Sequence, residues 1–216
     1  MRRTVQFVLA LQFAGVCVAG QSIGILFEFS AKPDSETVRS MQSEIREILA
    51  PAQLDLTFEP IDHSQTRPFG KIVIVRFRGT CEGRARLGLE NEEAVDFPAL
   101  GRTYVSDGRV LPYVQIYCDE VREFVPMNAK QAPSRTFGRA LGRVVAHELY
   151  HALLATRDHT RTGVARFAQS PRDLTRDKLA LDTHSIDLLR ALYAAKENED
   201  GSEEPSSNTE AYREPR

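Results

Sequence analysis

The sequence has no excess of positive charge and, after residue 20, no long hydrophobic run. Its 28 Lys and Arg residues stand against 30 Asp and Glu, which gives a formal net charge of −2 and an isoelectric point near 6.2. Nucleic-acid-binding domains normally carry a clear basic excess, and a membrane span needs about 18 or more apolar residues in a row. The composition therefore argues against a nucleic-acid binder and against a polytopic membrane protein. At 216 residues, 42% of them hydrophobic, the chain predicts one globular domain with tails.

Several signatures of other enzyme classes are also missing. The sequence holds no CxxC pair, which argues against a redox or zinc-thiolate role for its cysteines. It has no phosphate-binding loop, no dinucleotide-binding glycine pattern and no serine-hydrolase elbow. Any catalytic function must therefore come from another kind of site.

The two ends of the chain differ in composition from the rest. Met1-Arg2-Arg3 precedes an almost wholly apolar stretch, residues 4–20, which closes on small residues. This order is typical of a secretory signal peptide, with an uncleaved anchor helix as the alternative. We expect residues 1–20 to be removed, leaving a secreted or periplasmic protein with no stable membrane span. Residues 196–216 are acidic and polar, and we expect them to form a disordered tail. The domain would then span residues 21–195.

The cysteine count fits an exported protein. Cleavage of the signal peptide would remove Cys17 and leave Cys81 and Cys118. An even pair of cysteines in an oxidising compartment is a candidate disulfide. Two buried free thiols are the alternative.

Hydrophobic periodicity predicts an α+β domain with a small mixed β-sheet. Alternating apolar residues favour strands, and apolar residues at a spacing of three to four favour helices. The expected strands are residues 22–30, 54–58 and 71–78, followed by a hairpin of residues 100–105 and 110–117 around Asp107-Gly108. The expected helices are residues 34–50, 135–155 and 173–195.

One short segment carries recognisable chemistry. His147-Glu148-Leu149-Tyr150-His151 is an HExxH motif inside the second expected helix. Residues four apart lie on one face of a helix, so His147 and His151 can meet one metal ion from the same side. Glu148 then lies close enough to act on a water at that metal. A zinc ion would need a third protein ligand and would keep one position open.

The third ligand is less sharply defined by the sequence. His159 is the first candidate, because three of the five histidines fall between residues 147 and 159. No glutamate occurs between Glu148 and Glu197, which argues against a glutamate from a later helix. The alternatives are other acidic or imidazole side chains that follow the motif: Asp158, His184, Asp173, Asp177 and Asp182.

A motif of this kind on a long helix after a small sheet resembles the zincin metallopeptidases. A third histidine beyond a turn, as in HELYHALLATRDH, is similar to the metzincin branch. The resemblance implies a zincin-like domain with an HExxH active-site helix, zinc held by His147, His151 and His159, and Glu148 as general base. It also implies that an extended peptide or protein substrate pairs with a strand along the cleft, for which the hairpin of residues 100–117 is the expected source.

The sequence also departs from the metzincin pattern. Leu154 stands where that pattern, HExxHxxGxxH, has glycine, Arg157 stands in the place of the third histidine, and His159 follows two residues later. No methionine follows Met127, so the methionine turn beneath the metal is absent. The chain therefore resembles the zincins but not a familiar metzincin family, and its turn after the helix must differ.

Together these observations predict an exported zinc metallopeptidase, a hydrolase in which Glu148 activates water. The alternative is a non-catalytic zinc-binding domain used for binding or structural support, although such a domain has no need of a carboxylate beside the metal. An additional donor to the oxyanion is usual, and four residues are candidates: His184, Arg157, Tyr150 and Tyr104.

Overall fold

The computed structural model describes residues 22–200, apart from residues 67, 84–98 and 126–131. The predicted signal peptide, residues 1–20, lies outside the described residues, and so do residues 201–216 of the predicted tail. None of the helices in the described part of the chain has both the length and the apolar character of a membrane span.

Five strands form one mixed sheet, in the order β2-β1-β3-β5-β4. Strands β1, β2, β3 and β5 run parallel to one another, and the edge strand β4 runs antiparallel to β5. The sheet confirms the predicted mixed architecture and the hairpin at Asp107-Gly108. The strands are β1 (Ile23–Phe29), β2 (Leu56–Pro60), β3 (Lys71–Arg78), β4 (Gly101–Ser106) and β5 (Arg109–Tyr117).

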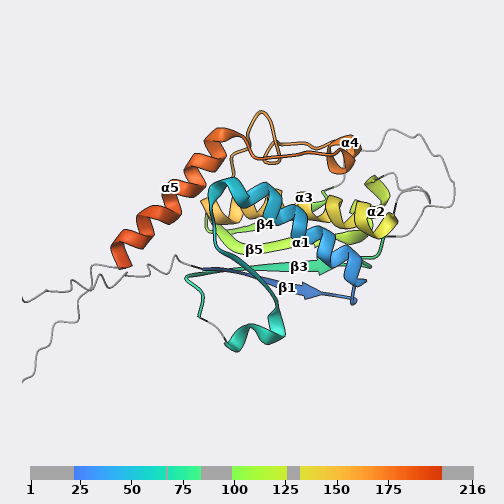
Figure 1. Cartoon of the computed structure of the whole chain (residues 1–216), viewed down its shortest axis with the longest axis horizontal. Coiled ribbons are helices and arrows are strands. Elements are labelled where there is room, and N and C mark those ends of the chain that lie inside the picture. Colours follow the sequence, from blue (N-terminus) through green and yellow to red (C-terminus); the bar gives the residue numbers. More distant parts are fainter. Residues whose placement is uncertain (1–21, 67, 84–98, 126–131, 201–216) are drawn as a thin grey trace, which may run out of the picture.

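Two long helices, α1 and α3, lie side by side against one face of this sheet (Figure 1). Their buried side chains interdigitate with those of β1, β3 and β5 to form the core. The α-helices are α1 (Ser35–Leu49), α2 (Cys118–Phe124), α3 (Pro133–Leu154), α4 (Pro171–Thr175) and α5 (Thr183–Asp200), and the short 3-10 helices are η1 (Ala50–Ala52) and η2 (Ile61–Thr66).

Glycines on α3 let the two helices approach closely. A Cβ atom at Gly138 would lie 2.4 Å from the carbonyl oxygen of Thr37, and one at Gly142 would lie 2.8 Å from that of Met41. At the same contact Arg143, which has no exposed surface, donates from Nε to Glu44 Oε1 at 2.6 Å. The contact fixes α3, and with it the HExxH segment, against the rest of the domain.

The last part of the chain differs from the sequence prediction. A single helix over residues 173–195 is wrong, because two separate caps divide the segment. Ser170 and Asp173 form a capping box that starts the short helix α4. Asp182 then accepts from the backbone N–H and the hydroxyl of Ser185 and caps α5. Helix α5 continues to Asp200, into the range expected to be tail, and helix α2 was not predicted at all.

The structure contains the predicted disulfide between Cys81 and Cys118. Both cysteines are buried, and the bond joins the end of β3 to the start of α2. It closes a loop of 37 residues, which restricts the unfolded chain more than the folded one.

We therefore expect the double variant Cys81→Ser/Cys118→Ser to lose about 2–4 kcal/mol of unfolding free energy. Urea denaturation monitored by circular dichroism would measure the loss. Reduced wild-type protein is the matched control and should show a shift of similar size. A denaturation midpoint unchanged by both treatments would mean that the two cysteines are not joined in the folded protein.

Candidate metal centre

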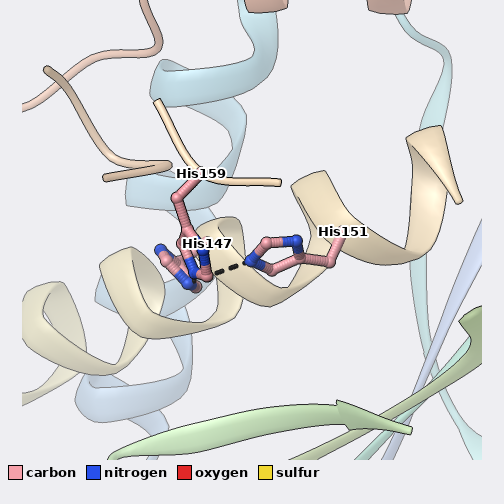
Figure 2. Close-up of side chains that lie close together, drawn as sticks. All are labelled: His147, His151 and His159. Carbon is pink, nitrogen blue, oxygen red and sulfur yellow. Dashed lines mark hydrogen bonds between the residues drawn. The ribbon is translucent and has the colours of Figure 1, made fainter. Parts of the chain in front are cut away.

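The last turns of α3 carry His147, Glu148 and His151. A left-handed turn brings His159 back to the two histidines (Figure 2). Helix α3 ends at Leu154, and Ala155 takes a φ of 52°, a conformation in which the chain leaves the helix axis. The left-handed residue is thus one position later than the glycine of the metzincin pattern, and the third histidine is two positions later.

Backbone carbonyls fix the tautomers of the two helix histidines. His147 Nδ1 lies 2.8 Å from the carbonyl oxygen of Val164, and His151 Nδ1 lies 3.0 Å from that of Thr156. A carbonyl oxygen can only accept a hydrogen bond, so both Nδ1 atoms carry the proton. In a neutral ring the other nitrogen, Nε2, then presents a lone pair.

These two lone pairs face each other. The Nε2 atoms of His147 and His151 lie 3.2 Å apart, as the dashed line in Figure 2 marks. Burial lowers the pKa of His147 to about 4, so a proton between the rings is disfavoured at neutral pH. Two nitrogens on one tetrahedral zinc at about 2.0–2.1 Å would be about 3.3–3.4 Å apart. The observed spacing therefore fits a shared metal ion.

His159 completes a cluster of three imidazoles. Its ring centroid lies 4.7 Å from that of His151 and 5.3 Å from that of His147. The candidate ligand nitrogens of the three residues all lie within 4.8 Å of one another, so this group could hold a metal ion.

The alternative third ligands lie elsewhere or have other partners. Asp173 is bound to Arg166 and to Ser170, and Asp182 caps α5. Asp158 shares a turn with Thr156, and the exposed His184 and Asp177 are absent from the described wall of the cavity. Among the described residues, the geometry favours His159.

Glu148 is a buried carboxylate beside this cluster. It is 6% exposed, and its burial raises its pKa to about 7, although hydrogen bonds from Thr103 act in the opposite direction. A carboxyl group with such a pKa can both take up and release a proton near neutral pH. Thr103 Oγ1 lies 2.8 Å from Glu148 Oε2, and it comes from strand β4.

A cavity of about 450 Å³ opens over these residues. Strand β4 forms one wall and the segment after α3 forms another, with Phe167 at the rim, 82% exposed and edge-on to the His159 ring at 5.1 Å. Apolar side chains dominate the rest of the wall, which includes Leu100, Val105, Val110, Phe124 and Val144. The cavity can therefore take an extended, partly apolar ligand next to the imidazoles.

Of the four candidate oxyanion donors, Arg157 lines the cavity. Tyr150 is 4% exposed and its hydroxyl is bound to Ser185, while the hydroxyl of Tyr104 donates to Gln115 at 2.8 Å. His184 is exposed at the start of α5 and is not part of the described cavity wall. Arg157 is therefore the one of these four candidates that lines the described cavity.

Sequence reasoning missed the groups that hold the site in place. The carbonyl groups of Thr156 and Val164 orient the imidazoles. Every residue has a backbone carbonyl, so residue type does not indicate which ones make this contact. Thr103 lies 45 residues before Glu148, and only the pairing of β4 with β5 brings it there. A local motif could not have indicated either contact.

Comparisons with known proteins give a distant structural likeness. No family model matches the sequence, and no curated protein matches it. Among solved structures, the chain is similar to archaemetzincin from Methanopyrus kandleri, with 10% sequence identity and a TM-score of 0.48. The similarity covers 82% of this chain and 97% of that one, and it is too distant to carry an argument about function.

Proposed function

We propose that this chain is an exported zinc metallopeptidase that hydrolyses peptide bonds with Glu148 as general base. The observation that carries the proposal is the pair of facing Nε2 atoms, 3.2 Å apart, beside a buried carboxylate in an open cavity. With both Nδ1 atoms protonated, the two Nε2 lone pairs point at each other and repel. A cation bound between them would remove this repulsion. The zincin resemblance of the HExxH segment supports the same proposal.

Zinc suits the donor set better than a harder cation. Three neutral imidazoles match zinc, whereas magnesium and calcium prefer oxygen ligands. His147, His151 and His159 would hold the ion. When bound, zinc supplies a Lewis acid that polarises a carbonyl and makes water a nucleophile near neutral pH.

The chain's own residues then have distinct roles. Glu148 takes a proton from the attacking water and later passes it to the leaving amine, for which a pKa near 7 is suitable. Arg157 would donate N–H groups to the carbonyl oxygen of the scissile bond. Strand β4, the last strand of the sheet, would pair with the peptide backbone along the cavity.

Export is a separate part of the proposal. It is supported by the signal-peptide pattern of residues 1–20 and by the disulfide between Cys81 and Cys118, a bond typical of oxidising compartments.

Metal content tests the proposed centre. Protein purified without added metal or a His tag is expected to contain about one zinc per chain by elemental analysis. His151→Ala and His159→Ala should lose most of it, because each removes one of three ligands. Chelation of the wild type should abolish cleavage of fluorescent casein, and zinc should restore it.

His184→Ala is the matched control, since it removes an exposed histidine that the structure places at the start of α5. It should keep its zinc and its activity. Zinc retained by His159→Ala would move the third ligand to another residue. Wild-type protein that takes up no zinc on reconstitution would end the peptidase proposal.

A further inference from the structure

The carboxylate of Glu148 is held from the sheet rather than from its own helix. Thr103 Oγ1 lies 2.8 Å from Glu148 Oε2 and 3.0 Å from the Glu148 carbonyl oxygen. Burial separates the Glu148 carboxylate from water. A buried carboxylate without a hydrogen-bond partner would destabilise the folded protein, because nothing would replace the lost hydration. Among the described residues, Thr103 is the hydrogen-bond partner of this carboxylate.

Gly101 shapes the space on the other side of the carboxylate. It precedes Thr103 by two residues, so both positions face α3 from the same side of β4. A Cβ atom at Gly101 would lie 3.1 Å from both Cγ and Oε1 of Glu148 and 3.0 Å from Ile116 Cδ1. The glycine therefore leaves just enough room for the second carboxylate oxygen.

The opposite face of β4 fixes this register. Arg102 stacks on the ring of Tyr104, with 4.4 Å from the guanidinium carbon to the ring centroid. The Tyr104 hydroxyl donates to Gln115 of β5 at 2.8 Å. A slip of β4 by one residue would exchange its two faces and replace Thr103 with a neighbouring side chain. These contacts keep the threonine hydroxyl on the Glu148 side.

We propose that Thr103 is a positioning residue for the general base, an inference that rests on the proposed peptidase function. Its hydroxyl holds Oε2 of Glu148 and leaves Oε1, beside Gly101, as the oxygen that exchanges the proton. The O–H bond of the attacking water breaks as an O–H bond forms at Oε1. When the peptide C–N bond breaks, the same proton moves from Oε1 to the leaving nitrogen.

The strand that carries Thr103 also borders the space in which a substrate would bind. Strand β4 is paired on one side with β5 and forms a wall of the cavity. A peptide that pairs with β4 would therefore contact the same strand that orients the base. Substrate alignment and base alignment then share one rigid element.

Three variants test the inference in zinc-loaded protein with fluorescent casein as substrate. Thr103→Val keeps the shape of the side chain but removes the hydroxyl, and kcat should fall about 10–100-fold, as for other residues that orient catalytic groups. KM, zinc content and Tm should stay close to wild type. Thr103→Ser retains the hydroxyl and should recover most of kcat. Thr57→Val, on strand β2 at the opposite edge of the sheet, is the matched control and should behave as wild type.

Two kinetic results would overturn the inference. One is wild-type kcat in Thr103→Val. The other is a Thr103→Ser variant as slow as Thr103→Val, because the methyl group rather than the hydroxyl would then be what matters.

A second measurement does not depend on turnover. Crystal structures of zinc-loaded wild type and Thr103→Val should show the Glu148 carboxylate fixed in the first and turned or disordered in the second. The same carboxylate position in both structures would overturn the inference even if casein is not cleaved. Failure of the proposed function looks different: zinc-loaded wild type would then not cleave casein, or cleavage would persist in Glu148→Gln, whatever the Thr103 variants do.

Discussion

Glu148→Gln protein is expected to bind zinc as the wild type does and to cleave peptide bonds about 10²–10⁴-fold more slowly. The amide has the size of the carboxyl group and can still accept a hydrogen bond from Thr103, so the local packing should persist. It cannot take a proton from water near neutral pH, which is the step that burial of Glu148 prepares. Initial rates on fluorescent casein, measured beside elemental analysis of the same samples, would give both results.

The matched control is Glu120→Gln, which makes the same change at an exposed position on α2. It should leave activity and zinc content unchanged. If Glu148→Gln lost its zinc, Glu148 would be a ligand rather than a base. If wild type and variant both bound zinc and neither cleaved peptides, the non-catalytic zinc-binding domain would become the better description.

Glu44→Ala should be among the most destabilising single substitutions in the domain, with a loss of about 3–5 kcal/mol in unfolding free energy. Its partner Arg143 has no exposed surface, and burial lowers the pKa of this guanidinium. Arg143 Nε donates to Glu44 Oε1 and Nη1 donates to the carbonyl oxygen of Asp173, each at 2.6 Å. Without Glu44, a buried positive charge would lose its counter-ion while α1, α3 and α4 still enclose it.

Urea denaturation of the zinc-free protein would measure this loss, so that metal binding does not mask it. Glu47→Ala, one turn further along α1 but exposed, is the control and should change stability little. The double variant Glu44→Leu/Arg143→Met should recover much of the loss, because it removes both charges. A Glu44→Ala midpoint equal to that of the control would show that water reaches Arg143 in solution.

Much of the fold could be predicted because its signals are local. The predicted bounds of β3 match the structure, since its β-branched residues fill a buried central strand. Helix α2 was missed because it has seven residues and buries only Cys118 and Val121, too few for a periodic pattern. The break between α4 and α5 was missed because Leu179 and Leu181 are buried there without being helical, and their apolar character resembled a continuing helix.

The site divides in the same way. The spacing of His147 and His151 is a property of any helix, so the motif alone predicted that the two rings meet. His159 was selected because it lies close to the motif in the sequence. Its return to the cluster depends on the left-handed conformation of Ala155, which could not be predicted because alanine rarely adopts it. Thr103 and the Val164 carbonyl are long-range partners, and their places follow from sheet register and loop path rather than from any local pattern.

The Val164 carbonyl also links the candidate metal centre to the loop that follows α3. This carbonyl accepts from His147 and from the Gln169 side chain, and the Val164 N–H is itself bound to Ala180. By thermodynamic linkage, an ion that bound the oriented imidazoles more tightly than disoriented ones would also stabilise the ordered state of this loop. Loss of such an ion would therefore loosen the segment around Val164 and Gln169 before the sheet, and hydrogen exchange of its amide groups would report the change.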